Sequence, residues 1–123
     1  MNPELETLAR RAVACKHWRW MPGMKALDGY RVLTSKDDGY NFSSVDIDGY
    51  QDLATDWSTP DLSDPATVGC LLALVREAWD SPRISPVGTV LGWVVYTPGD
   101  RYNHDAYGAT EAAALVAALE GAP

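Results

Sequence analysis

The stretch from Asp64 to Trp79, DPATVGCLLALVREAW, decides the fold because it is the clearest amphipathic helix in the chain. Asp64 can accept a hydrogen bond from the free amides of the first turn, and Pro65 suits the first helical position, where no N–H is needed. Apolar side chains then recur every three or four residues, which is typical of one buried face. They are Val68, Leu71, Leu72, Val75, Ala78 and Trp79. Leu74 lies off this face, so the sequence predicts a helix over 64–80 that is covered on more than one side.

Two further helices flank the remaining segments. A helical pattern over residues 4–17 places Val13 on its buried face. Thr110 can cap a closing helix over 110–120. The residues of this closing helix expected to face inward are Ala112, Leu115, Val116 and Leu119.

The tripeptide Asp-Gly-Tyr occurs three times at a spacing of ten, at residues 28–30, 38–40 and 48–50. Asp-Gly supplies the backbone angles that tight hairpin turns need, and each Tyr begins the strand that follows. The intervening runs are strand-like, so we expect an antiparallel meander within residues 24–50 and an irregular connection over 51–63.

A second strand-rich segment lies at residues 88–107. The run from Gly88 to Thr97 is rich in β-branched and aromatic residues and predicts one continuous strand, with a more polar strand returning over 101–107. Helices that pack against local hairpins indicate an α+β fold, with a small antiparallel sheet and about three helices. The length fits a single domain over residues 1–123.

Metal binding is not expected. Asp46 and Asp48 resemble part of an EF-hand calcium loop, but Ser44 and Thr55 occupy the positions where its first and last carboxylates belong. Turn chemistry with solvated acids explains these aspartates better. The two cysteines and two histidines also lack the close ligand pairs of structural zinc sites.

No catalytic motif is present. The sequence lacks a nucleophile elbow, a phosphate loop, a dinucleotide fingerprint and a paired-cysteine knuckle, so we predict no catalytic residue and no cofactor. An enzyme would have to assemble its site from scattered residues such as Arg101, His104 and Asp105.

Charge is unevenly distributed along the chain. The net charge is +3 over residues 1–31, −7 over residues 32–66 and −7 for the whole chain. A negative chain is repelled by phosphate backbones, which disfavours nucleic acid as a partner. The N-terminal residues lack the apolar core of a signal peptide and no apolar run is long enough for a membrane span, so we expect no membrane association.

Two segments are candidates for binding another protein. The loop WRWMPGM over residues 18–24 offers aromatic and Arg side chains, which are enriched in binding hot spots, although packing at the core edge is the alternative. The acidic meander could meet a basic partner surface. The candidate binding residues are Trp18, Arg19, Trp20, Met21, Tyr40, Tyr50, Asp37, Asp38, Asp46, Asp48 and Asp52.

Three of these segments together resemble a group of small proteins encoded by bacteriophages and prophages. They are WRWMPGM (18–24), DLSDPATVGCLLALVREAW (61–79) and YGATEAAALVAALEGAP (107–123). The resemblance covers roughly half the chain and not the Asp-Gly-Tyr meander, which looks like a variable insertion. It implies a shared fold and a phage origin, and it carries no catalytic residues.

We therefore expect a non-enzymatic phage or prophage accessory protein in the cytoplasm of the bacterial host. It would bind a host or phage protein, with its acidic surface suited to inhibiting a host enzyme. The alternatives are a small enzyme of unknown reaction and a self-associating structural protein, which would form a homodimer through the Trp18–Trp20 region.

Overall fold

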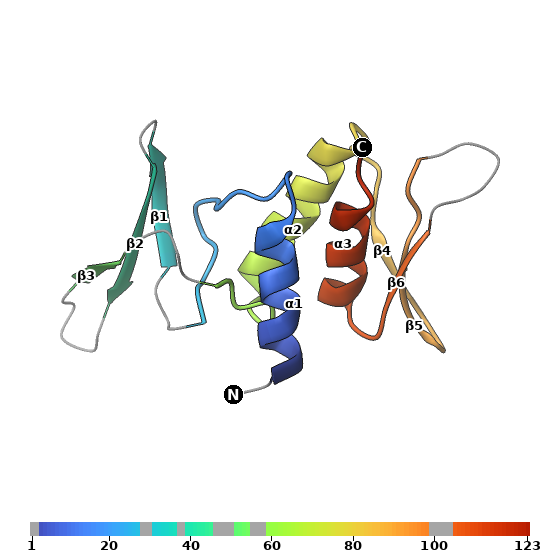
Figure 1. Cartoon of the computed structure of the whole chain (residues 1–123), viewed down its shortest axis with the longest axis horizontal. Coiled ribbons are helices and arrows are strands. Elements are labelled where there is room, and N and C mark those ends of the chain that lie inside the picture. The colour runs from blue at the N-terminus through green and yellow to red at the C-terminus, as the bar shows by residue number, and fades with distance from the viewer. Residues whose placement is uncertain (1–2, 28–30, 37–38, 46–50, 55–58, 99–104) are drawn as a thin grey trace.

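The computed structural model describes residues 3–27, 31–36, 39–45, 51–54, 59–98 and 105–123, and for the strands between residues 31 and 54 it describes the backbone. Within these residues the fold is α+β, as predicted, with three helices and two three-stranded antiparallel sheets (Figure 1). In chain order the elements are α1 (Pro3–Ala14), β1 (Arg31–Lys36), β2 (Gly39–Val45), β3 (Gln51–Ala54), α2 (Pro65–Ala78), β4 (Pro86–Thr89), β5 (Gly92–Val95), β6 (Ala106–Gly108) and α3 (Glu111–Glu120).

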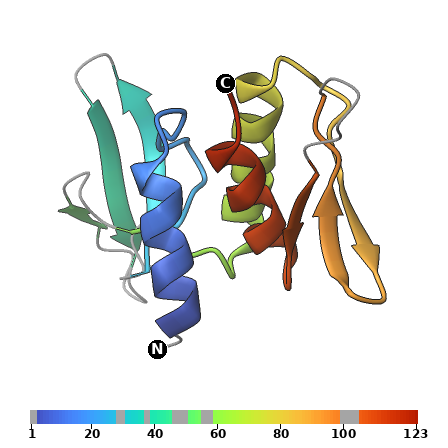
Figure 2. The same ribbon diagram turned by 45° about the vertical axis from the view of Figure 1, so that its right-hand side comes forward.

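Helix α3 is the centre of the core. It contacts α1 and α2 on one side and the sheet of β4, β5 and β6 on the other, so it forms a middle layer (Figures 1 and 2). The Thr110 side chain caps it by accepting a hydrogen bond from the Ala113 amide, which confirms the predicted cap. Its buried residues are Ala112, Ala114, Leu115, Val116, Ala118 and Leu119. The four residues predicted to face inward are therefore confirmed, but the buried surface extends around most of the helix.

Helix α2 begins as predicted. The Asp64 carboxylate accepts hydrogen bonds from the Thr67 amide at 3.0 Å and from the Thr67 hydroxyl at 2.9 Å. Leu74, which the pattern placed off the main face, is 1% exposed, whereas Leu72 is only half-buried. At the end of α2 the indole of Trp79 donates to the Ala118 carbonyl at 2.8 Å, which ties α2 to α3.

Helix α1 ends at Ala14, three residues before the predicted end. The chain then tightens into two turns, in which the Cys15 amide donates to the Ala12 carbonyl and the Trp18 amide donates to the Cys15 carbonyl, both at 3.1 Å. Trp20 follows and is 4% exposed. The periodic pattern could not predict this early end, because the turns are needed to bring Trp20 into the core.

The buried face of α1 is narrow. It consists of Leu8, Ala9 and Ala12, and the small alanines allow a close approach to the rest of the core. The prediction that Val13 belongs to this face was wrong, since Val13 is 39% exposed.

The second sheet has the strand order β4-β5-β6. The prediction of one continuous strand from Gly88 to Thr97 was wrong, because the chain reverses at Val90 and Leu91, and β4 pairs with β5 as a hairpin. The strand β6 (Ala106–Gly108) returns against β5, as expected for this segment, while residues 101–104 of the expected strand lie outside the described residues. Proline at the start of β4 suits an edge strand, since it lacks the N–H that a central strand would use.

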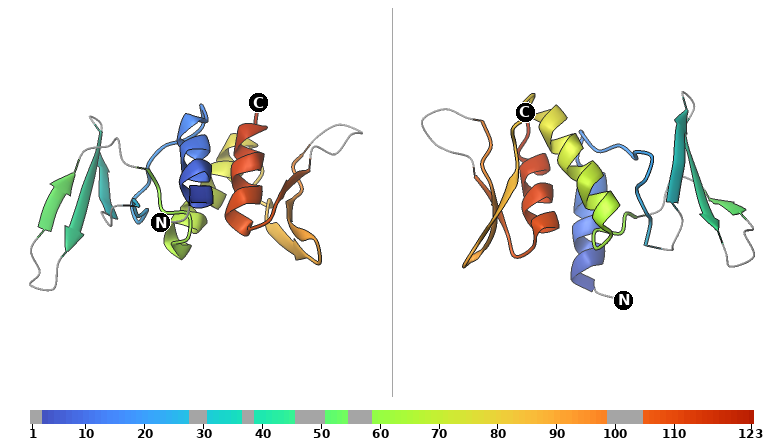
Figure 3. Two further views of the ribbon diagram at one scale, coloured as in Figure 1. Left: turned by 60° about the horizontal axis from the view of Figure 1, so that its bottom comes forward. Right: turned by 180° about the vertical axis from the view of Figure 1, so that it is seen from behind.

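The first sheet has the order β1-β2-β3 and is an antiparallel meander, which confirms the predicted topology. Its third strand is Gln51–Ala54, outside the expected range of 24–50 and within the segment expected to be irregular. The strands of this sheet lie apart from the helices and from β4–β6 in the described residues (Figures 1 and 3). An isolated antiparallel bridge pairs Ala26 with Pro60, so the segment that precedes this sheet in the chain lies beside the segment that follows it.

Among the helices that the structure describes, none has the length and apolar character needed to cross a membrane.

Candidate binding surface

The tip of the β4–β5 hairpin exposes two large aliphatic side chains. Val90 and Leu91 are fully exposed, at 104% and 98%. Two backbone polar groups of this turn are satisfied by one side chain, because the Thr89 hydroxyl accepts from the Leu91 amide at 3.2 Å and donates to the Gly92 carbonyl at 3.0 Å. Gly92 has a φ of 133°, which a residue with a side chain rarely adopts. The turn is thus held by its own polar contacts and presents both aliphatic side chains to solvent.

One face of the second sheet continues this apolar surface. The register places Val87 opposite Val94 and Val94 opposite Tyr107, so the three side chains form one row. Val94, in the middle of this row, is buried, whereas Val87 and Tyr107 on either side of it are exposed. Tyr96 follows Val94 by alternation on the same face and is also exposed. The opposite face carries buried Val95 and is directed at α3. We call the exposed set Val87, Val90, Leu91, Tyr96 and Tyr107 the hairpin face.

The residues of the hairpin face other than Tyr107 belong to the longest charge-free run of the sequence, 16 residues over 84–99. The next longest runs, 65–75 and 112–119, lie within α2 and α3. The centres of protein interfaces are depleted in charged residues and enriched in aromatic ones. The hairpin face has this composition, although the chain as a whole carries a net charge of −7.

A hollow of about 460 Å³ lies between α1 and the first turn of α3. We call it the α1–α3 hollow. Its lining residues are Pro3, Glu4, Leu5, Thr7, Leu8, Arg11, Ala109, Thr110 and Ala113. A second hollow of about 650 Å³ opens between α2 and α3. The two hollows share the lining residues Leu5 and Thr110. Both hollows have mostly apolar walls.

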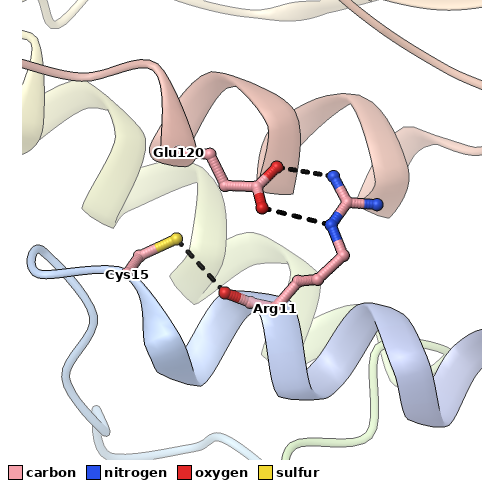
Figure 4. A network of polar contacts seen from close by, with 3 residues as sticks. All are labelled: Arg11, Cys15 and Glu120. Atoms are coloured by element: carbon pink, nitrogen blue, oxygen red, sulfur yellow. Dashed lines mark hydrogen bonds and ion pairs between the residues drawn. The ribbon is translucent and has the colours of Figure 1, made fainter.

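Arg11, at the edge of the α1–α3 hollow, is held by an ion pair. Its Nε and Nη2 atoms donate to the two carboxylate oxygens of Glu120 at 3.1 and 2.5 Å, which joins α1 to the end of α3 (Figure 4). The hydrogen bonds that Arg11 donates to Glu120 raise the pKa of Arg11. Beside it the Cys15 thiol donates to the Arg11 carbonyl at 3.3 Å, and burial raises the pKa of this thiol. Cys15 is therefore protonated at neutral pH and is a poor nucleophile.

The loop over residues 18–24 is mainly structural in the parts that the structure describes. Trp20 and Met24 are buried, and Trp18 packs edge-on against Trp20 with ring centroids 5.5 Å apart. Arg19 donates to Glu77 at 2.6 Å, and this hydrogen bond lowers the pKa of Glu77. The buried indole nitrogen of Trp18 has no hydrogen-bond partner in the described part of the chain. Met21 is half-buried.

The acidic candidates cannot be placed in the same way. Asp37, Asp38, Asp46, Asp48 and Tyr50 lie outside the described residues. For Tyr40 in β2 and Asp52 in β3 the structure gives the backbone only.

Of the residues considered for an enzyme site, only Asp105 is described, while Arg101 and His104 lie outside. One carboxylate oxygen of Asp105 is buried and has no hydrogen-bond partner among the residues with a described position. Within the same part of the chain, no three His, Cys, Asp or Glu side chains come together as a metal site.

No protein-family model matches the chain, and no curated protein or solved structure is significantly similar to it. The resemblance to phage and prophage proteins therefore rests on the three sequence segments alone.

Sequence reasoning missed the hairpin tip. Val90 and Leu91 are not turn-forming residues, and they were assigned to a strand. The signal that could have revealed the turn is the pair Gly88 and Gly92, spaced as they would be on either side of a tight reversal. Exposure of the tip depends on tertiary packing, which local sequence does not encode.

Proposed function

We propose that the protein is a non-enzymatic accessory protein of a bacteriophage or prophage, and that it acts by binding another protein through the hairpin face. The observation that carries the proposal is the full exposure of Val90 and Leu91 at the tip of an uncharged hairpin. Moving a large aliphatic side chain out of water stabilises a complex by about 1.5–3 kcal/mol. Neither side chain contributes this burial free energy to the folded monomer, so both can contribute it to a complex.

The residues around the tip support the same role. Tyr96 and Tyr107 are exposed beside it, and tyrosine combines a large apolar ring with a hydroxyl that can pair at an interface. Aromatic side chains are frequent in binding hot spots. A tip of two aliphatic residues flanked by tyrosines is thus suited to an apolar depression on a partner.

The acidic stretch over residues 32–66 is a second contact surface in this proposal. Its net charge of −7 is suited to a basic surface, such as the nucleic-acid channel of a host enzyme that the protein would inhibit. This part of the proposal is supported by charge alone.

Affinity capture from bacterial lysate tests the hairpin face. The tip variant combines Val90→Ser with Leu91→Asn, two polar residues that are common in turns. We expect it to lose proteins that the wild type captures, since the apolar contact is removed. Val13→Ala is the matched control, because it trims another exposed aliphatic side chain on a different face.

Circular dichroism establishes that each variant is folded before capture. An Asp46→Lys/Asp48→Lys variant, tested in parallel, isolates the contribution of the acidic stretch. An identical set of captured proteins for the wild type and all variants would contradict binding through either surface.

The alternative of a small enzyme is favoured by one observation, the buried carboxylate oxygen of Asp105 without a described partner. Buried polar atoms without partners are uncommon and occur at catalytic sites. Asp105→Asn keeps the shape of the side chain and removes its charge. A hydrolase substrate screen with the wild type and this variant tests the alternative, which requires turnover by the wild type only.

A further inference from the structure

We infer that the protein holds an extended segment of its partner as an added strand, on the open edge of β4 (Pro86–Thr89) beside the hairpin face. This inference rests on the proposed function, because it names the kind of segment that the same surface takes. It concerns the backbone at the edge of the sheet, whereas the proposed function concerns the exposed side chains of the tip. Different variants therefore test the two.

Strand β4 lies at one end of its sheet. The strand order is β4-β5-β6, so β4 pairs with β5 on one side and with no described strand on the other. Figure 2 shows β4 as the outermost strand on its side of the molecule. Val87, Gly88 and Thr89 are exposed. An edge of this kind presents unpaired backbone N–H and C=O groups, which are a template for a further strand.

Pro86 indicates which backbone groups of β4 point to the open side. In an antiparallel pair, residues that exchange hydrogen bonds with the partner strand alternate with residues that do not. Proline has no N–H, and it is found in edge strands where the missing donor would face solvent. The alternation then directs the backbone groups of Val87 and Thr89 at β5, and those of Gly88 outward. The open edge thus offers the N–H of Gly88 and the carbonyls of Pro86 and Gly88.

Both faces of this edge carry apolar groups. Val87 belongs to the hairpin face on one side. On the other side the Trp93 ring lies against Gly88, because a Cβ built at Gly88 would be 3.6 to 3.8 Å from three carbon atoms of the ring. This ring is half-buried and packs against the core. A strand added at β4 would therefore place one side chain beside the Trp93 ring and the next beside Val87.

These features favour an extended, uncharged segment as the occupant. Backbone groups at strand spacing pair with another extended backbone, and the side chains at alternate positions then give specificity. A partner that offered only an apolar depression would leave the outward N–H of Gly88 without a hydrogen bond from the complex. Residues 84–99 carry no charge, so β-branched and apolar side chains suit the segment that packs on them.

Amide hydrogen exchange of the free chain, followed by NMR, tests the geometry first. The amides of Val87 and Thr89 point at β5 and should be protected. The amide of Gly88 points outward and should exchange as fast as a solvent-exposed amide. Slow exchange at Gly88 in the free chain would overturn the inference, because this edge would already be paired.

A random library of synthetic nonapeptides, added to the full chain, tests binding. We expect the selected peptides to share a short uncharged run of β-branched and apolar residues, and to protect the Gly88 amide from exchange. Methylation of the peptide amide that donates to a β4 carbonyl should weaken binding about tenfold, because a hydrogen bond is lost. Methylation of the next amide, which points away from β4, is the matched control and should leave the dissociation constant unchanged.

Gly88 offers a matched pair of variants on the protein side. Gly88→Pro removes the outward N–H and should abolish peptide binding. Gly88→Ala keeps the N–H and should bind as the wild type does, since its Cβ makes only ordinary contacts with the Trp93 ring. Protection of the Val87 and Thr89 amides shows that the hairpin of each variant is intact. If Gly88→Pro disrupts the hairpin, the methylated peptides decide the question alone.

Two results would overturn the added strand. One is a library from which no peptide binds. The other is peptide binding that survives the methylation of every amide in turn, because such binding would not use the backbone of the segment.

Lysate capture separates the inference from the proposed function. If the tip variant loses captured proteins and Gly88→Pro does not, the proposed function stands and the added strand fails, because the partner then docks through side chains alone. If Gly88→Pro loses them and the tip variant does not, the edge binds and the tip does not. If neither variant loses them, both proposals fail, and losses in both variants leave both standing.

Discussion

Two charge-free runs of this chain have opposite environments. Residues 112–119 form most of α3 and are nearly all buried, whereas residues 84–99 expose Val87, Val90, Leu91 and Tyr96 on the hairpin. The helix has neighbours on both sides, while the sheet of the hairpin contacts one described helix, α3, on one of its faces. Absence of charge therefore does not distinguish a core segment from a binding segment. The distinction is whether folding covers the apolar side chains.

The largest difference is expected when one leucine is truncated to alanine in each of these two charge-free runs. Leu115→Ala removes a fully buried side chain from α3 and should lower the free energy of unfolding by about 2–5 kcal/mol. Leu91→Ala removes a fully exposed one and should change it by less than about 0.5 kcal/mol. Urea denaturation at a concentration that keeps the chain monomeric measures both values. Equal losses would show that the tip is part of the core.

The contact between the sheet and α3 should give an intermediate effect. A Cβ at Gly108 would lie 2.3 Å from the Ala114 amide nitrogen, so Gly108→Ala must push β6 away from the helix. We expect a loss of about 1–3 kcal/mol in the free energy of unfolding. Gly88→Ala is the control, because its Cβ would meet only the Trp93 ring at 3.6 Å, an ordinary contact. A control that destabilises as much would mean that strand propensity, not contact with α3, is decisive.

A small stabilising effect is expected in the third charge-free run, 65–75 in α2. Gly69 is exposed in this helix, and a Cβ there would meet nothing within 4 Å. Gly69→Ala should raise the free energy of unfolding by about 0.5–1 kcal/mol, since glycine loses more backbone entropy in a helix than alanine does. Thermal unfolding followed by circular dichroism should show a higher midpoint. A lower midpoint would contradict the prediction and would indicate that the added methyl group disturbs a contact of α2.

Features set by local chemistry could be predicted from the sequence. Asp64 and Thr110 cap helices where a side-chain oxygen precedes free amides, and β1, β2 and β3 form the predicted antiparallel meander. Features set by packing could not. Helix α1 stops at Ala14 so that Trp20 can enter the core, and α3 is central although its sequence pattern is shorter than that of α2.

The candidate site was the least predictable part of the molecule. The sequence pattern assigned Val90 and Leu91 to the interior of a strand, because consecutive β-branched and aliphatic side chains normally indicate a buried strand. The tryptophan loop had the composition of a hot spot, and yet the structure uses Trp20 to fill the core. In both cases the burial or exposure of the residues depends on contacts with distant parts of the chain, which the residue types alone do not specify.

The central position of α3 also affects how the chain acquires its structure during synthesis. Residues 111–120 leave the ribosome after α1, α2 and the strands β4–β6, which all pack on this helix. At a synthesis rate of about 5–20 residues per second, the apolar faces of these earlier elements remain uncovered for seconds. The layers of the core can therefore pack together only after α3 has been synthesised, although most of the elements that contact it precede it in the chain.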